Sequence, residues 1–162
     1  MKVLTLQFPV GYNQYAQNGG SHVLHITLLM DTYFKVEHLY NHRCSQCSFV
    51  GATEKKFNII NAPQILVIHL CRLTTGFEKI HTFVQCNTEL TTDHIRDTNG
   101  QQMTYRLVGI IRHSGPSIEF GHYIAYVLID DSWYEANDTT MTQVSWQIVS
   151  RVQVYMLFYE RI

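Results

Sequence analysis

Charged residues are scarce in this sequence, and none of them form a block of one sign. They make up 15% of the 162 residues, and the formal net charge is −1 at pH 7. Proteins that bind polyanions usually carry a clear basic patch, so this balance argues against a nucleic-acid partner. Long apolar runs are also missing, because the longest, such as residues 65–70, fall far short of the roughly 20 residues that a membrane helix needs. The sequence therefore predicts neither a nucleic-acid partner nor a membrane span.

A secretory signal is also lacking. Residues 1–9 alternate like a strand and contain neither a long apolar core nor a small-residue cleavage site. Only four cysteines are present, and a chain of this length does not need disulfides, so we expect reduced thiols or metal ligands. The one N-glycosylation sequon, Asn137-Asp138-Thr139, falls where the active site is expected below. These features favour a cytoplasmic or nuclear protein.

What the sequence does contain is enough apolar and aromatic surface for a packed core. Hydrophobic residues make up 46% of the chain, which includes ten tyrosines and eight phenylalanines. Helical spacing predicts one helix ahead of residue 37, from Leu24, Leu28, Leu29, Tyr33 and Phe34. A loop rich in Asn, Gln and Gly, residues 11–21, is expected before it. A second, shorter helix is expected after Ser145, whose side chain suits an N-cap.

Most of the chain is predicted to be β-sheet. Six segments are enriched in β-branched and aromatic residues, namely residues 56–60, 65–73, 79–84, 105–113, 122–129 and 152–160. Several follow one another closely, and Asn99-Gly100 marks one turn, so antiparallel pairing is expected. The predicted fold class is therefore α+β with a mostly antiparallel sheet.

A histidine at the start of one predicted strand is the best candidate for chemistry. His122 follows Gly121, and Asn137 with Asp138 ends the stretch that returns beside it. A Cys–His–Asn/Asp system uses such an imidazole to take the thiol proton, while the third residue holds the other ring nitrogen. Alternatives remain at this point: Asn-Asp is a common turn pair, and other histidines such as His113 are equally expected as hydrogen-bonded polar residues.

The stretch from Gly121 to Asp138 resembles the histidine box of ubiquitin-specific proteases, in which Gly-His-Tyr, an apolar strand and Trp-Tyr-x-x-Asn/Asp-Asp follow one another. The similarity covers essentially the whole chain in family order. It includes Leu28-Leu29, Cys44-x-x-Cys47, the run from Pro63 to Arg72 and the final Val154-Tyr155-Met156-Leu157-Phe158-Tyr159. The resemblance implies the palm of a papain-like cysteine protease over about residues 61–162, and half of a zinc-ribbon fingers region over about residues 1–60.

The resemblance also implies roles for individual residues. His122 would be the general base and Asn137 the orienting residue, with Asp138 as an assistant or alternative. A loop over residues 114–120 would flank the channel for the ubiquitin tail, and the substrate-binding residues implied are Ser114, Gly115, Phe120, Gly121 and Tyr123. The implied reaction is cysteine-type hydrolysis of the bond after the C-terminal glycine of ubiquitin, with ubiquitin and ubiquitinated proteins as partners and no cofactor for catalysis.

The largest departure from the family pattern is the nucleophile. The family's cysteine box, an Asn-Thr-Cys-Tyr type sequence, has no counterpart here, and Cys71 and Cys86 lie in or beside predicted strands without a feature that lowers a thiol pKa. We therefore expect that the chain begins inside a larger domain and that it is inactive alone, since the oxyanion donors are absent too. The alternative is an inactive ubiquitin-binding or scaffolding pseudoenzyme.

Cys44 and Cys47 form one half of a zinc ribbon. Two thiolates supply two of the four tetrahedral ligands, and a second knuckle must supply the others. The resemblance implies that the second cysteine pair precedes Met1, so structural zinc is expected only if that pair is supplied. His42 is a candidate third ligand. A small zinc-dependent interaction domain without a link to ubiquitin is a further alternative.

Overall fold

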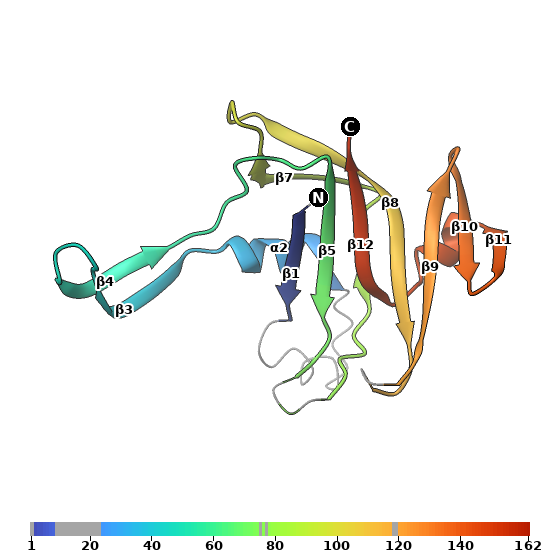
Figure 1. Ribbon diagram of the computed structural model, residues 1–162, viewed down its shortest axis with the longest axis horizontal. Coiled ribbons are helices and arrows are strands. Elements are labelled where there is room, and N and C mark those ends of the chain that lie inside the picture. The colour runs from blue at the N-terminus through green and yellow to red at the C-terminus, as the bar shows by residue number, and fades with distance from the viewer. Residues whose placement is uncertain (1, 9–23, 75, 77, 118–119) are drawn as a thin grey trace.

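The largest element of the structure is one twisted sheet with a helix on one face (Figure 1). The computed structural model describes residues 2–8, 24–74, 76, 78–117 and 120–162. The loop expected over residues 11–21 lies outside them. The eight-stranded sheet runs in the order β1-β5-β12-β8-β9-β10-β11, and β7 also pairs with β8. Its strands are β1 (Lys2–Gln7), β5 (Ile65–Cys71), β7 (Glu89–Arg96), β8 (Gln102–Ser114), β9 (His122–Ile129), β10 (Ser132–Asn137), β11 (Thr140–Val144) and β12 (Val154–Arg161).

Antiparallel pairing dominates this sheet, as the close spacing of the strands predicts. The exception is β1, which lies parallel to β5 with Leu4 opposite Ile68. A parallel pair needs a long crossover, and the chain between these two strands contains a helix and a separate hairpin. A second parallel pair is formed by the short strands β2 (Leu24–His25) and β6 (Val84–Gln85). The α+β class with a mostly antiparallel sheet is confirmed.

The predicted long helix is present but shorter at its start. Helix α2 (Ile26–Phe34) buries Ile26, Leu29, Met30 and Phe34. Leu24 belongs to β2 instead of the helix, because its backbone pairs with Val84. Buried residues of β5 and β12, including Ile68 and Leu157 at 0% exposure, form the centre of the core beneath this helix. Burial of the α2 apolar face thus holds the helix against the sheet.

Two of the predicted strands are wrong. Residues 56–60 contain only a single bridge, between Ile59 and Ile95. Of residues 79–84 only Val84 belongs to a strand, because the Arg72 guanidinium takes the carbonyl oxygens of Ile80 and Thr82 that a ladder would need. The strand expected at residues 122–129 matches β9.

The turn and the second helix are confirmed. Gly100 has a φ of +81°, a conformation that favours glycine, and its N–H donates to the Asp97 carbonyl between β7 and β8. Helix α3 (Trp146–Val149) follows Ser145, which occupies the N-cap position without a side-chain capping hydrogen bond.

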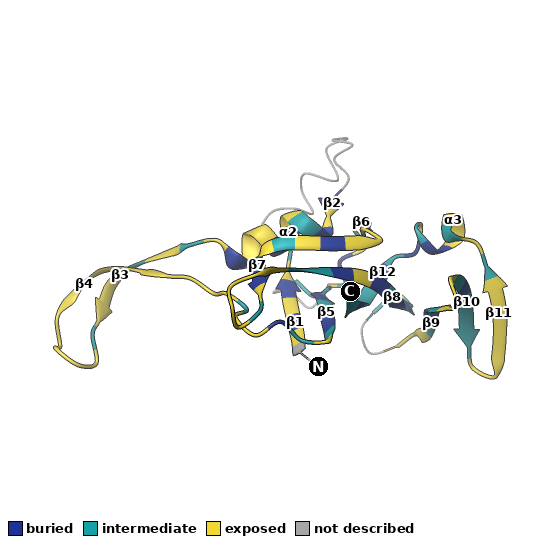
Figure 2. Cartoon of the chain, turned by 90° about the horizontal axis from the view of Figure 1, so that it is seen from above, coloured by how far each residue is buried: buried dark blue, intermediate teal, exposed yellow. Residues whose placement is uncertain are grey.

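A separate hairpin projects from the sheet (Figures 1 and 2). Strands β3 (Glu37–Arg43) and β4 (Val50–Lys55) pair only with each other and form a two-stranded sheet. No residue of either strand is buried, and Tyr40 is 77% exposed. Cys44 and Cys47 lie at the turn of this hairpin. The proposed division of the chain near residue 60 stays a prediction.

Candidate active site

Two neighbouring strands bring the predicted histidine and asparagine together. Strand β9 begins at His122 and the antiparallel β10 ends at Asn137, so a single short hairpin places both residues at the same end of the sheet. The distance from His122 Nε2 to Asn137 Oδ1 is 2.6 Å. The pairing is therefore set by the register of β9 and β10, which a slip of one residue would destroy.

This hydrogen bond fixes which ring nitrogen is available for chemistry. An amide oxygen only accepts, so His122 Nε2–H donates to Asn137, and the neutral ring keeps its lone pair on Nδ1. Nδ1 has no hydrogen-bond partner within the described part of the chain. The His122 side chain is 46% exposed, so the imidazole ring is open to an external thiol. The arrangement can therefore act as an oriented general base.

Asp138 lies near the same ring but farther away. Its Oδ2 is 3.8 Å from His122 Nε2, which exceeds the length of a hydrogen bond. Asp138 has a φ of 50°, and its side chain is 77% exposed. The carboxylate thus adds a screened negative charge near the base, while Asn137 makes the orienting contact.

Close backbone contact next to the base requires two glycines. A Cβ atom on Gly121 would overlap the His113 ring, and one on Gly115 would overlap the carbonyl oxygen of Phe120. Ser114 pairs across the strands with His122. The residue preceding the base therefore has to be glycine for the β8 and β9 ends to approach this closely.

Two large side chains predicted to bind substrate are exposed beside the base. Phe120 is 72% exposed and Tyr123 is 53% exposed. Residues 118 and 119 of the predicted loop lie outside the described residues. The substrate-binding roles of Ser114, Gly115, Phe120, Gly121 and Tyr123 stay predictions.

Sequence reasoning missed Lys79, which lies against the predicted site. Lys79 Nζ is 3.2 Å from His113 Nδ1 and also donates to the carbonyl oxygens of His113 and Gly115. His113 is buried at 4% exposure and hydrogen-bonded, as the alternative interpretation of this histidine held. No local pattern marks a lysine 34 residues earlier in the chain, because the contact depends on the tertiary fold.

Within the described residues, none of the four cysteines forms a hydrogen bond with His122 that would make it the nucleophile. No hydrogen bond joins a cysteine to His122 across residues 24–74, 78–117 and 120–162. Burial raises the pKa of Cys86 to about 12, against the smaller opposing effect of Arg72, so this thiol stays protonated. Cys71 ends β5, and Cys44 and Cys47 lie on the separate hairpin.

Among the described residues, no group of three or more His, Cys, Asp or Glu side chains could hold a metal ion. His42 therefore forms no three-ligand group with Cys44 and Cys47 in this structure, and its role as a third ligand stays a prediction. The knuckle itself suits a thiolate, because the backbone N–H groups of Cys47 and then Gln46, with a further bond from the Cys47 side chain, lower the pKa of Cys44. The described helices also include none long and apolar enough to cross a bilayer.

The family model for ubiquitin carboxyl-terminal hydrolase matches residues 13–159. The chain belongs to this family. A relative from Saccharomyces cerevisiae, ubiquitin carboxyl-terminal hydrolase 8, is 29% identical over 147 residues, covering 80% of this chain and 31% of the relative. Ubiquitin carboxyl-terminal hydrolase 25 of Arabidopsis thaliana is 36% identical over 126 residues, covering 74% of this chain and 19% of the relative.

Solved structures of this ubiquitin hydrolase family share the fold. The SAGA DUB module of Ubp8, Sgf11, Sus1 and Sgf73 bound to monoubiquitin contains a chain with a TM-score of 0.79 and 25% identity, and the match covers 99% of this chain and 35% of that one. The papain-like α+β class is therefore confirmed. The chain spans about a third or less of the length of the relatives it matches.

Proposed function

We propose that this chain supplies the general base of a cysteine-type deubiquitinase, which cleaves the bond after the C-terminal glycine of ubiquitin. The observation that carries the proposal is the 2.6 Å contact between His122 Nε2 and Asn137 Oδ1, which leaves Nδ1 of an exposed imidazole as the only basic nitrogen. An imidazole oriented in this way suits proton transfer from a thiol and to a leaving amine.

The His122 imidazole performs two proton transfers in each of two half-reactions. In the first, Nδ1 takes the thiol proton as the sulfur attacks the carbonyl carbon of the ubiquitin glycine. The imidazolium then protonates the leaving amine of the substrate lysine, and an acyl thioester remains. In the second, the neutral ring takes a proton from water as the water oxygen attacks the thioester carbonyl. The C–S bond then breaks, the imidazolium returns its proton to the leaving sulfur to give the free thiol, and the ubiquitin carboxyl group is released and ionises. Asn137 keeps the ring in the required tautomer throughout.

The nucleophilic thiol comes from outside these 162 residues in this proposal. The support lies in the surroundings of the cysteines present: Cys86 is buried with a raised pKa, and no cysteine is hydrogen-bonded to the base in the described part of the molecule. The chain alone is therefore expected to be inactive. The chain extended by the residues encoded upstream of Met1 is expected to be active, and this longer protein is called here the completed domain.

Ubiquitin is the proposed partner. The structural relative with a TM-score of 0.79 is bound to monoubiquitin, which supports ubiquitin as the ligand of the same fold here. Phe120 and Tyr123 are exposed beside His122 and offer apolar surface to an extended peptide tail. A tail that ends in two glycines is thin enough to lie against such a crowded strand end.

We also propose a structural zinc site at the hairpin turn. The backbone hydrogen bonds to Cys44 stabilise a thiolate there, and Cys47 adds a second sulfur. These two residues would supply two of four tetrahedral ligands, and the metal would stiffen the hairpin without touching substrate. No catalytic cofactor is part of the proposal.

A cytoplasmic or nuclear location is the natural setting for this site. A glycan on Asn137 would occupy the amide that orients His122, so passage through the secretory pathway would disable the base. Unchanged gel mobility after glycosidase treatment of the protein from its own cells is the expected result.

A ubiquitin probe with a C-terminal electrophile tests the proposal. The probe should label the completed domain through a cysteine upstream of Met1, and His122→Ala should lower the labelling rate by about 100-fold or more. The 162-residue chain alone should stay unlabelled. An upstream coding sequence without a cysteine box, or a completed domain that binds ubiquitin without reacting, would replace the enzyme with a ubiquitin-binding module.

A further inference from the structure

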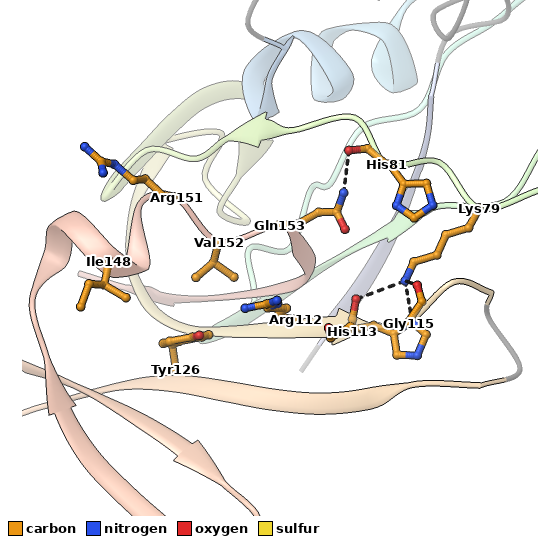
Figure 3. Close-up of a pocket in the computed structure, with 11 residues that line it drawn as sticks. Lys79, His81, Arg112, His113, Gly115, Tyr126, Ile148, Arg151, Val152 and Gln153 are labelled. Carbon is orange, nitrogen blue, oxygen red and sulfur yellow. Dashed lines mark hydrogen bonds between the residues drawn. The ribbon is translucent and has the colours of Figure 1, made fainter.

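One lysine holds the β8 backbone directly opposite the proposed base. Ser114 on β8 pairs with His122 on β9. The Lys79 Nζ donates hydrogen bonds to the carbonyl oxygen of His113 at 3.2 Å and to that of Gly115 at 2.6 Å (Figure 3). The carbonyl groups on both sides of Ser114 are therefore held by one side chain, and Ser114 is the cross-strand partner of His122.

The remaining donor of Lys79 goes to the His113 ring. Lys79 Nζ lies 3.2 Å from His113 Nδ1. An ammonium group has three N–H donors and no acceptor, so His113 Nδ1 has to accept, and the ring proton lies on Nε2. Burial, and then the charge of Lys79, lower the pKa of His113, which favours this neutral form. All three donors of the lysine are thus engaged by His113 of β8 and by Gly115, which directly follows that strand.

The His113 ring contacts the residues on both sides of His122. It lies against Gly121, where a Cβ atom would overlap its Nε2. It also packs on the Tyr123 ring, with 4.6 Å between the ring centroids and an interplanar angle of 30°. A shift of the His113 ring would therefore disturb the Gly121 backbone before the base and the Tyr123 side chain after it.

The segment that carries Lys79 is itself anchored to the sheet. Arg72 is 3% exposed and donates to the carbonyl oxygens of Ile80 at 3.0 Å and Thr82 at 2.7 Å. It also donates to the Val154 carbonyl of the central strand β12 at 2.6 Å. The segment that carries the lysine is consequently bound to the core. The hydrogen bonds from Lys79 therefore fix the end of β8 relative to the core.

Lys79 also borders a cavity of about 390 Å³ that includes Arg112 and Arg151 (Figure 3). No carboxylate is among the described residues that line it. A ligand site for an anion would need free N–H donors, whereas those of Lys79 are already bound to His113 and Gly115. The contacts of this lysine therefore indicate a role inside the protein.

We propose that His113, held by Lys79, is a positioning residue for the His122 base. The inference rests on the proposed function, since it concerns the same proton transfer. Neither residue touches the reacting atoms, so their loss should misplace the imidazole without removing it. A displacement on the order of 1 Å costs up to roughly 100-fold in rate. We expect kcat to fall by about 10-fold to 100-fold and KM to change by less than about threefold.

The test uses Lys79→Met and His113→Phe in the completed domain. The methionine keeps the length of the lysine without its donors, and the phenylalanine keeps the ring packing without the Nδ1 acceptor. Lys35→Met is the matched control, because Lys35 is exposed at the C-terminal end of α2. Lys79→Arg should restore much of kcat, since it retains a cation with N–H donors. If Lys79→Met does not fold, Lys79→Gln, with two N–H donors, should show an intermediate loss.

Nitrogen-15 NMR of the histidine side chains reports on the His122–Asn137 hydrogen bond and does not depend on catalytic activity. The His122 Nε2–H signal should be protected from exchange in the wild type and in Lys35→Met, and should broaden in the folded Lys79→Met and His113→Phe variants. A normal signal with kcat within twofold of wild type would overturn the proposal, and so would a rise in KM alone. The wild type could also fail to hydrolyse the ubiquitin substrate while the His122 Nε2–H signal still broadens in the variants. In that case the proposed function fails and the positioning role stands.

Discussion

The strand end that carries His122 and the hairpin that carries Cys44 differ in what fixes their geometry. The end of β8 and β9 is held by buried side chains, with His113 at 4% exposure and a lysine that spans three acceptors. The β3–β4 hairpin has no buried residue, and its strands pair only with each other (Figure 2). A proton-transfer site needs preorganised side chains, whereas a metal ligand pair needs only a local turn until the metal binds.

The largest effect should come from breaking the orienting contact at the fixed end. Asn137→Ala in the completed domain removes the acceptor at 2.6 Å from His122 and should lower kcat on a fluorogenic ubiquitin adduct by about 100-fold. Asp138→Ala should lower it by less than about tenfold, because its carboxylate lies 3.8 Å away and is exposed.

Asp130→Ala is the matched control for Asp138→Ala. Both aspartates are exposed and have positive φ angles, 46° and 50°, but Asp130 lies in the opposite turn, between β9 and β10. Asp130→Ala should leave kcat unchanged. A larger loss in Asp138→Ala than in Asn137→Ala would mean that the carboxylate is the orienting group.

The sequence predicts the His122–Asn137 pair because both residues lie on strands joined by one short hairpin. Antiparallel register over so few residues leaves little choice of partner. Lys79 could not be predicted in the same way, since its partners lie 34 and 36 residues away and no sequence spacing encodes that contact.

The errors in secondary structure have a related cause. Residues 79–84 have the composition of a strand, yet the buried Arg72 guanidinium takes two of their carbonyl oxygens. Likewise, Leu24 fits the apolar face of a helix, but its backbone pairs with Val84. In both places a tertiary contact overrides local propensity, which is the usual limit of sequence patterns.

A pair of glycine substitutions should show a smaller effect on stability. Gly121→Ala would place a Cβ against the His113 ring and the Ser114 carbonyl, and the ring is buried and hydrogen-bonded to Lys79. We expect a loss of about 1–3 kcal/mol in the free energy of unfolding. Gly51→Ala in the hairpin meets only the Phe49 ring, which is 68% exposed and can swing away. Its effect should stay within about 0.5 kcal/mol.

Thermal and denaturant unfolding of the completed domain measure both changes. Assays well below the unfolding midpoint should also show a loss of kcat for Gly121→Ala, because the displaced ring lies beside the base. Equal destabilisation by the two substitutions would show that the hairpin is as tightly packed as the strand end, against the exposure of its residues.

The smallest effect on turnover should come from removing the proposed zinc. The completed domain should contain about one zinc ion per chain by elemental analysis, because two thiolates from elsewhere would complete the four ligands. Cys44→Ser with Cys47→Ser should abolish the metal, while Cys71→Ser, at the end of β5, should retain it.

Loss of zinc should lower the thermal midpoint and raise proteolysis at the hairpin, yet change kcat by less than about threefold. The reason is that the hairpin strands form their own two-stranded sheet and do not pair with β8, β9 or β10, so a loosened hairpin leaves the register at His122 intact. The 162-residue chain should hold far less than one equivalent, since two sulfurs alone bind zinc weakly. Stoichiometric zinc in the chain alone would instead favour a self-contained metal site, and a large fall in kcat would show that the two regions are coupled.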